Sequence, residues 1–201
     1  MKIYFSPFSP YVRKCMVTAH ELGLDQRIEL LACAAHPVNR DAKIVADNPL
    51  GKIPTFFTDD GQVLFDSRVI CEYLNDLGRG AIFPPAGPAR WQALTLHALA
   101  DGMLDAALLL RYEITARPEA LRWADWQTGQ MEKIEASMRA LDGQVGQLQG
   151  RVDIGTLALA CALGYLDLRF ADLDWRARHA PLAAWAAEFM QRPSMQASWA
   201  L

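Results

Sequence analysis

The chain has 201 residues, of which 52% are hydrophobic and 21% are charged, and its formal net charge is −3. This length and composition are typical of a globular protein with one large domain or two small ones. Basic and acidic residues are balanced in both halves, and no stripe of Lys and Arg occurs, which argues against nucleic acid or an anionic membrane as a main partner.

Three features predict a cytoplasmic protein with no membrane partner and no metal site. The apolar run at the N-terminus ends at Pro7 and is too short for the core of a signal peptide. The most apolar later stretch, 157–166, contains Gly164 and precedes Asp167, so we expect no membrane-spanning segment. The cysteines form no Cys-x-x-Cys pair and no His lies at metal-ligand spacing, which predicts free thiols in a reducing compartment. The four cysteines are Cys15, Cys33, Cys71 and Cys161.

Residues 1–77 show a mixed pattern of strands and helices. Helically spaced apolar residues followed by Gly23 predict a first helix, and a second helix follows Asp66-Ser67. Short apolar runs predict strands, and the sequence Asp-Asp-Gly at 59–61 predicts a hairpin between two of them. The expected strands are 2–5, 28–31, 55–57 and 62–65, and the expected helices are 10–22, 68–77 and a short one near 41–46.

The pattern changes after a segment rich in Gly and Pro at 78–88. Beyond this segment every apolar pattern is helical and no strand alternation is visible. We therefore expect a mixed α/β domain at 1–77, a linker at 78–88 and an all-α domain at 89–201. The helices expected in the last part are 91–112, 121–141, 154–170 and 181–190.

Ser9 and Pro10 form a helix-start signal directly after the first strand. Ser is a favoured N-cap, and Pro is tolerated at the first helical position because its missing N–H has no partner there. A hydroxyl at this place faces the positive end of the helix dipole, where an anion is favoured. Taken alone, the pair more often marks a simple cap than an active site.

Two further motifs follow in the same domain. The loop 48–54 contains two prolines around a glycine, and its last pair, Ile53-Pro54, stands directly before a strand. That proline is interpreted as either a turn residue at a strand edge or the site of a cis peptide bond. Asp66-Ser67 stands at a helix start, where free N–H groups and a hydroxyl offer an anion site, or where Ser67 is only the N-cap.

Together these motifs resemble the thioredoxin-like domain of the glutathione transferases, in particular the bacterial serine-type branch called YibF-like. The loop 48–54 resembles the family's Asn-Pro-x-Gly-Lys-x-Pro loop, and 66–70 resembles its acidic-Ser-x-x-Ile element. A helical domain after a linker also matches the family, so the resemblance covers essentially the whole chain. It implies an α/β plus all-α fold, in which a mixed four-stranded sheet with helices precedes the helical domain.

The resemblance implies a site for glutathione, a tripeptide with a carboxylate at each end. A cis Pro54 would present the backbone of Ile53 to the cysteinyl part of the ligand. Asp66 and Ser67 would bind the ammonium and carboxylate of the γ-glutamyl part. Lys52 is a candidate for the glycyl carboxylate, with plain solvent exposure as the alternative. His36 and Arg40 are weaker candidates in the neighbouring loop.

Ser9 is the candidate catalytic residue. A hydroxyl that donates to sulfur at a helix N-terminus would stabilise the glutathione thiolate, which is the nucleophile. Ser6 is the alternative, and Ser9 is preferred because it immediately precedes the Pro that starts the helix. A glutaredoxin-like turn would read Cys-Pro-Tyr-Cys, whereas this one has Ser9 and Val12 in those places, which excludes dithiol exchange here.

The helical domain would line the pocket for a small hydrophobic electrophile. Asp101 is a weak candidate for reaching the glutathione of a partner subunit in a homodimer. Asp153 is expected to cap a buried helix, with Thr156 three residues later. The function implied is a glutathione transferase of detoxification type. The alternatives are other glutathione chemistry (isomerisation, dehalogenation, peroxide or disulfide reduction) or a ligand-binding protein without turnover.

Overall fold

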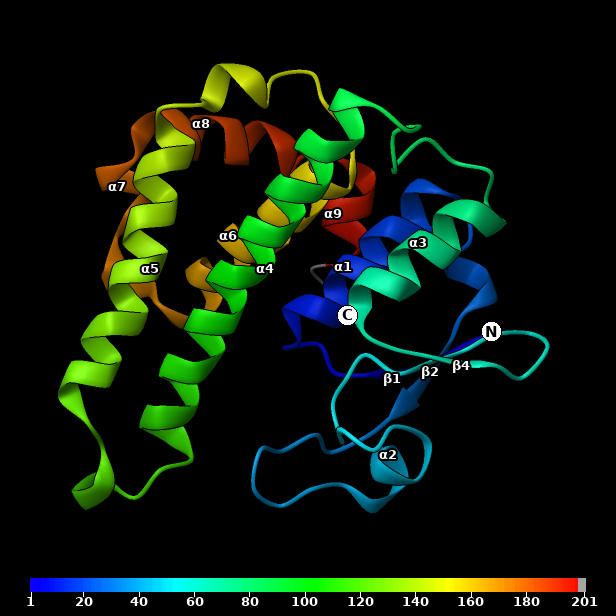
Figure 1. The fold of residues 1–201 in the computed structure, drawn as a ribbon, viewed down its shortest axis with the longest axis horizontal. Coiled ribbons are helices and arrows are strands. Elements are labelled where there is room, and N and C mark those ends of the chain that lie inside the picture. Colours follow the sequence, from blue (N-terminus) through cyan, green and yellow to red (C-terminus); the bar gives the residue numbers. More distant parts are fainter. Residues whose placement is uncertain (199–201) are drawn as a thin grey trace. The chain divides into compact units, whose positions relative to one another are not determined.

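A four-stranded mixed sheet organises the first part of the chain in the computed structural model, which describes residues 1–198 (Figure 1). The strands are β1 (Lys2–Phe5), β2 (Glu29–Ala32), β3 (Phe56–Phe57) and β4 (Val63–Leu64). Their order is β2-β1-β3-β4, with β1 parallel to β2 and the other two pairs antiparallel. This is the mixed sheet that the family resemblance implied.

Helices cover both faces of this sheet. In Figure 1, α1 and α3 lie on one side of the strands and α2 lies on the other. The apolar residues of β1 are buried against apolar residues of α1 and α3, because each of these helices turns its apolar face to the sheet. The helices of this unit are α1 (Pro10–Glu21), α2 (Ala42–Asp47), α3 (Ser67–Leu77) and α9 (Pro193–Ala197). Side chains with no exposed surface include Ile3, Val12, Val17, Phe56, Ile70 and Leu74.

The hairpin strands are shorter than the pattern predicts. The sequence predicts strands at 55–57 and 62–65, whereas β3 and β4 have two residues each. At the turn the Thr58 amide still donates to the Gln62 carbonyl at 3.0 Å, but the Gln62 amide donates to Thr58 Oγ1 at 2.8 Å instead of to a backbone carbonyl. Thr55 makes one backbone contact just before β3, where its carbonyl accepts from the Tyr4 amide at 2.9 Å.

The described residues divide into two compact units, Met1–Gly87 with the C-terminal helix α9, and Pro88–Arg192. Helix α9 belongs to the first unit because Arg13 on α1 donates from Nε to Ser198 Oγ at 3.2 Å and from Nη2 to the Met195 carbonyl at 3.3 Å. The division expected from the sequence instead assigned all residues from 89 onwards to the helical domain. The second unit also begins one residue earlier than expected, with Pro88 at the start of α4.

The second unit is entirely helical within the described part of the chain, as the resemblance implied. Its long helix α4 packs against both α5 and α6. Helix α5 begins at Ala124 rather than near 121, because Glu119–Leu121 form a separate 3-10 turn. The helices are α4 (Pro88–Thr115), α5 (Ala124–Asp142), α6 (Ile154–Arg169), α7 (Trp175–Arg178) and α8 (Ala180–Phe189).

Helix α6 is the buried centre of the second unit, and its start has the expected cap. Asp153 Oδ1 accepts from the amides of Gly155 and Thr156, while Thr156 Oγ1 accepts from the Asp153 amide at 3.0 Å. This reciprocal arrangement is a capping box. Gly155 allows α4 to come close, since a Cβ there would lie 2.7 Å from the Ala93 carbonyl oxygen.

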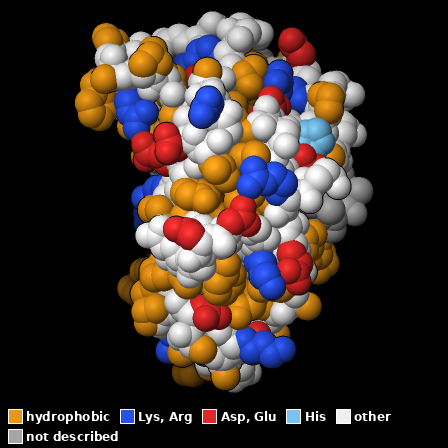
Figure 2. Space-filling view, turned by 90° about the vertical axis from the view of Figure 1, so that its right-hand side faces the viewer, with side chains coloured by type: hydrophobic (Ala, Val, Ile, Leu, Met, Phe, Trp, Pro, Cys, Tyr) orange, Lys and Arg blue, Asp and Glu red, His pale blue; other side chains and the backbone are white. Residues whose placement is uncertain are grey.

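Helix α4 has the length and hydropathy of a membrane span, but 56% of its most apolar 18-residue window is buried inside the protein. Core helices of soluble proteins have the same properties. On the face of the molecule drawn in Figure 2, basic and acidic side chains are interspersed among apolar ones. That distribution agrees with the balanced charge of the sequence.

We predict that Asp153→Ala lowers the free energy of unfolding by about 1–2 kcal/mol, because the amides of Gly155 and Thr156 at the start of α6 lose their buried acceptor. Urea unfolding followed by far-ultraviolet circular dichroism measures this change. Glu132→Ala is the matched control, since Glu132 is an exposed acid on α5. Equal urea midpoints for the two variants would show that the cap does not stabilise the unit.

Candidate active site

Ser9 caps α1 at the turn that follows β1. Its backbone is extended, its Oγ accepts from the Val12 amide at 3.3 Å, and Pro10 is the first helical residue. The Ser9 amide donates to the Ser6 carbonyl at 3.1 Å. A hydroxyl that accepts one bond still has a proton to donate, and among the described residues no acceptor takes it. The cap is therefore present, and a donor remains at the positive end of the helix.

Ser6 and Cys33 lie beside the same turn. Ser6 Oγ accepts from the Phe8 amide at 3.4 Å. Cys33 follows β2, and its Sγ donates to the Phe5 carbonyl at 3.4 Å. Burial is the main reason why the pKa of the Cys33 thiol is raised above its usual value, so this sulfur is a poor nucleophile near neutral pH. Sequence reasoning did not connect Cys33 with this turn, because only the parallel pairing of β1 with β2 joins them.

The proline loop presents the backbone of Ile53. The Ile53–Pro54 peptide bond is cis, which is one of the two alternatives left open by the sequence. Within residues 1–198, neither the amide nor the carbonyl of Ile53 has a hydrogen-bond partner. The side chain of Ile53 is half-buried, and Pro54 beside it is buried. An unpaired amide and carbonyl on one half-exposed residue can pair with an extended peptide.

The buried side chain of Asn48 holds this loop in place. It is 1% exposed, and its Nδ2 donates to the Lys52 carbonyl at 3.2 Å and to Thr55 Oγ1 at 2.9 Å. Its Oδ1 accepts from the Leu50 amide at 3.0 Å. Gly51 has a φ of +62°, a left-handed conformation that favours glycine. These contacts fix the backbone on both sides of Ile53.

Helix α3 begins at the second motif, and its cap is Asp66 rather than Ser67. Asp66 Oδ1 accepts from the Arg68 amide at 2.9 Å, and the Phe65–Asp66 peptide bond is cis. Ser67 is the first helical residue and is 2% exposed. In the part of the chain that the structure describes, the Ser67 amide and hydroxyl have no partner, whereas its carbonyl accepts from Cys15 Sγ at 3.8 Å.

Lys52 and Arg40 differ in what they contact. The side chain of Lys52 is exposed and has no hydrogen bond or ion pair to any described residue. Arg40 donates to the Pro49 carbonyl, and a Cβ at Gly51 would lie 2.9 Å from Arg40 Nε. Arg40 therefore supports the proline loop from outside, which is a structural role.

The weaker candidates His36 and Asp101 also have partners close to them in the chain. His36 Nδ1 accepts from the amides of Val38 and Asn39 at 3.1 and 2.9 Å, so this ring organises its own exposed loop. Asp101 is 2% exposed on α4, and its Oδ2 lies 3.3 Å from His97 Nε2 one turn earlier. Among residues 1–198, no group of three or more His, Cys, Asp or Glu side chains is placed to hold a metal ion.

Comparison with known proteins identifies the family. The family model for the glutathione S-transferase N-terminal domain matches residues 8–77, and the model for the C-terminal domain matches 124–188. An Escherichia coli K12 protein described as an uncharacterized GST-like protein, YibF, is 36% identical over 180 residues, which cover 87% of this chain and 86% of YibF. This chain belongs to the glutathione S-transferase family. The resemblance drawn from the motifs is confirmed.

Solved structures of family members agree with this assignment. A glutathione transferase family member from Pseudomonas fluorescens Pf-5, crystallised with bound glutathione, is 48% identical, with a TM-score of 0.95 over 98% of this chain and 97% of that one. A second structure from the same organism contains bound S-(propanoic acid)-glutathione, at 46% identity and a TM-score of 0.90 over 98% of both chains. A glutathione S-transferase from Methylobacillus flagellatus KT with glutathione bound is 32% identical, with a TM-score of 0.86 over 98% of both chains.

We predict that Asn48→Ala lowers the free energy of unfolding by about 1–3 kcal/mol, because the Leu50 amide and Thr55 hydroxyl lose a buried partner. Thermal or urea unfolding measures the change. Asn39→Ala is the control, because Asn39 is exposed and lies in the neighbouring loop. If both variants unfold at the same urea concentration, Asn48 does not hold the loop.

Proposed function

We propose that this protein binds glutathione in its first unit and holds the thiol as a thiolate beside Ser9, for attack on a small apolar electrophile. The observation that carries this proposal is the Ser9 hydroxyl, which caps α1 and keeps its proton available for an acceptor. Glutathione bound to two family members that are 48% and 32% identical supports the choice of ligand.

The γ-glutamyl end of glutathione would bind at the start of α3. The unpaired amide and hydroxyl of Ser67 can donate to its carboxylate, at the end of an 11-residue helix where the dipole favours an anion. The carboxylate of Asp66 accepts only one backbone bond from the described residues, so it can also accept from the ligand ammonium. The carboxylate would thus meet two neutral donors at the positive end of the helix dipole, and the ammonium would meet the carboxylate of Asp66.

The cysteinyl part would pair with the backbone of Ile53. An amide and a carbonyl on one residue can exchange two hydrogen bonds with an extended peptide, as in strand addition. This pairing would fix the direction of the cysteinyl side chain. Lys52, an exposed cation one residue earlier, is the proposed partner of the glycyl carboxylate. An exposed ion pair of this kind contributes about 1 kcal/mol or less.

Ser9 would then stabilise the thiolate without ionising itself. A free thiol has a pKa of about 8.5 and is mostly protonated at neutral pH. A hydrogen bond from Ser9 Oγ and the positive end of α1 both favour the anion. In the reaction, the sulfur lone pair forms a bond to the electrophilic carbon, and the displaced electron pair leaves with the leaving group or is protonated.

Membership of the family supports broader proposals. We propose that the first unit, with residues 1–77 and α9, forms the glutathione domain, that 78–88 serve as a linker, and that the second unit forms the domain that binds the electrophile. We also propose that the protein is a cytoplasmic homodimer that acts in detoxification.

The P. fluorescens structure with bound S-(propanoic acid)-glutathione supports thioether chemistry, because its ligand carries a carbon chain on the glutathione sulfur.

We predict that Ser9→Ala raises the thiol pKa of bound glutathione by about 1 unit or more, since each unit corresponds to about 1.4 kcal/mol of lost thiolate stabilisation. Ultraviolet absorbance of the thiolate, followed against pH at saturating glutathione, measures this pKa. The rate of reaction with 1-chloro-2,4-dinitrobenzene at neutral pH should fall about tenfold per unit.

Ser6→Ala and Cys33→Ala are the controls for this experiment, and both should keep the thiolate signal. If Ser6→Ala removes the signal and Ser9→Ala keeps it, Ser6 is the thiolate partner. Glutathione binding to the unmodified protein without any thiolate absorbance would contradict the proposed chemistry and indicate a binding protein.

We predict that Ser67→Ala raises the Kd for glutathione about tenfold, since a hydrogen bond to a charged group is worth about 1.5–3 kcal/mol. The thiolate pKa at saturation should not change, because Ser67 contacts the other end of the ligand. Isothermal titration calorimetry measures the Kd. Ser137→Ala, at a partly exposed position on α5, is the control, and equal affinities of the two variants would remove Ser67 from the site.

A further inference from the structure

A small pocket of about 150 Å³ lies within the helical unit, between the turn that precedes α6 and the C-terminal half of α8. Residues 148–152 line it from the turn. Trp185 and Phe189 line it from α8, and Arg192 lines it from the residues that follow α8. A space of about 150 Å³ can hold a molecule of the size of benzene.

The indole N–H of Trp185 is a hydrogen-bond donor that lacks an acceptor. Trp185 is 3% exposed, and its ring lies against that of Phe189 with the centroids 5.0 Å apart. No described residue accepts from its Nε1, although this atom still has contact with solvent. A tryptophan buried to this extent usually has a partner for its N–H. Because Trp185 lines the pocket and is otherwise buried, a ligand in the pocket can supply that partner.

The turn before α6 adds three backbone donors. It is closed by a hydrogen bond from the Arg151 amide to the Leu148 carbonyl at 3.3 Å, and Gly150 has a φ of +70°. The amides of Gln149, Gly150 and Val152 have no acceptor among the described residues. Unpaired backbone N–H groups in a turn can bind an anion together. The pocket thus has several donors on its walls that the fold leaves without acceptors.

Two arginines and one glutamate supply the charges of the pocket. Arg151 is already bound within the fold, because its guanidinium donates to Asp153 Oδ2 at 2.8 and 2.9 Å. Arg192 is half-buried, and its guanidinium lies 5.6 Å from the centroid of the Phe189 ring. Glu188 is exposed, and its carboxylate pairs with no described residue. Arg192 therefore attracts an anion to the pocket, and Glu188 opposes it from the solvent side.

The remaining surface of the pocket is apolar. Leu148 and Phe189 are buried, and Val152 is half-buried. A ligand that suits the pocket needs acceptors for the N–H groups and a short apolar part for these side chains. A carboxylate fits the first requirement, because its two oxygens accept several hydrogen bonds and charge strengthens each of them. The volume limits the apolar part to a chain of about six carbon atoms or fewer.

We propose that this pocket binds a small carboxylate with a short apolar chain. The carboxylate accepts from the indole N–H of Trp185 and from the unpaired amides of the turn, and Arg192 supplies the opposite charge. The site lies within the helical unit and uses none of the glutathione-binding residues proposed above. Ser9→Ala should therefore leave it unchanged, and its failure is distinguishable from a failure of the glutathione chemistry.

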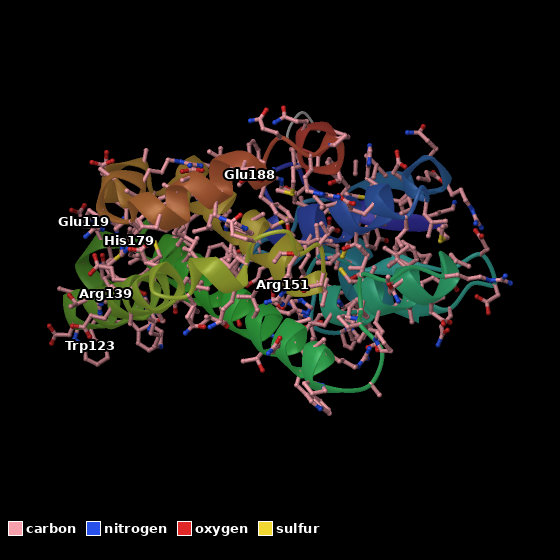
Figure 3. The ribbon with its side chains drawn as sticks, turned by 90° about the horizontal axis from the view of Figure 1, so that it is seen from above. Glu119, Trp123, Arg139, Arg151, His179 and Glu188 are labelled. Atoms are coloured by element: carbon pink, nitrogen blue, oxygen red, sulfur yellow. The ribbon has the colours of Figure 1, made fainter. Side chains whose placement is uncertain are left out.

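The test is a nuclear magnetic resonance titration of the isotope-labelled protein with butanoate and with its neutral analogue butanamide. We expect butanoate to shift the indole signal of Trp185 and the amide signal of Gly150 with one common Kd. This Kd should be about tenfold or more below that of butanamide, since charged acceptors bind N–H groups more strongly. The indole signal of Trp123 should not move, because Trp123 is 62% exposed at the start of α5 (Figure 3). Equal affinities for acid and amide, or no shift of the Trp185 and Gly150 signals, would overturn the proposal.

Two variants should change the affinity in opposite directions. Trp185→Phe removes the N–H and keeps an aromatic ring, so the Kd of butanoate should rise about tenfold. Glu188→Gln removes the opposing charge and should lower the Kd; its exposed position keeps it informative even if Trp185→Phe fails to fold. Glu119→Gln is the matched control, because Glu119 is another exposed acid of the same unit and lies apart from Glu188 in Figure 3. If Glu188→Gln and Glu119→Gln both bind butanoate like the unmodified protein, the proposed site is wrong.

Discussion

The packing of α1 on α3 is the constraint on which the candidate active site depends. Cys15 on α1 donates from Sγ to the carbonyl of Ser67 at 3.8 Å, and its sulfur lies 3.9 Å from that of Cys71 on α3. Cys15 is six residues after Ser9, about 9 Å along the helix axis. The apolar core beneath both helices is closed to solvent. The N-terminus of either helix therefore cannot shift without disturbing the packing of this core. One contact thus couples the proposed thiolate donor to the proposed carboxylate site.

The observed role of Ser9 and its proposed role do not compete. As an N-cap its oxygen accepts from the Val12 amide, and as the proposed thiolate partner its proton would donate outward. The cap holds the oxygen, which leaves the proton as the only part free to rotate. A side chain fixed in this way loses little entropy when the ligand binds. Under the proposal, helix stability and thiolate stabilisation reinforce one another, so the cap observed at Ser9 is compatible with the proposed catalytic role.

Local sequence predicts the features that depend on local chemistry. The caps at Ser9 and Asp153 follow from residue types at helix starts, and the family follows from three short motifs. Contacts made across the sheet were not predictable, such as Cys33 with Phe5, because they need the strand register. Even the cap of α3 was ambiguous between adjacent residues, because both Asp and Ser are good caps.

The protein's own sulfurs are poorly suited to the proposed thiol chemistry. Cys15, Cys71 and Cys161 are buried, and burial raises the pKa of Cys33. A buried or protonated thiol is a weak nucleophile. The turn that would hold reactive cysteines in a dithiol protein has Ser9 and Val12 instead. The positive end of α1 and the free hydroxyl proton of Ser9 thus form a site that favours a thiolate. The chain itself has no cysteine at this turn. In the proposed complex, the thiol of glutathione would meet the Ser9 hydroxyl at the start of α1, and its γ-glutamyl carboxylate would meet Ser67 at the start of α3.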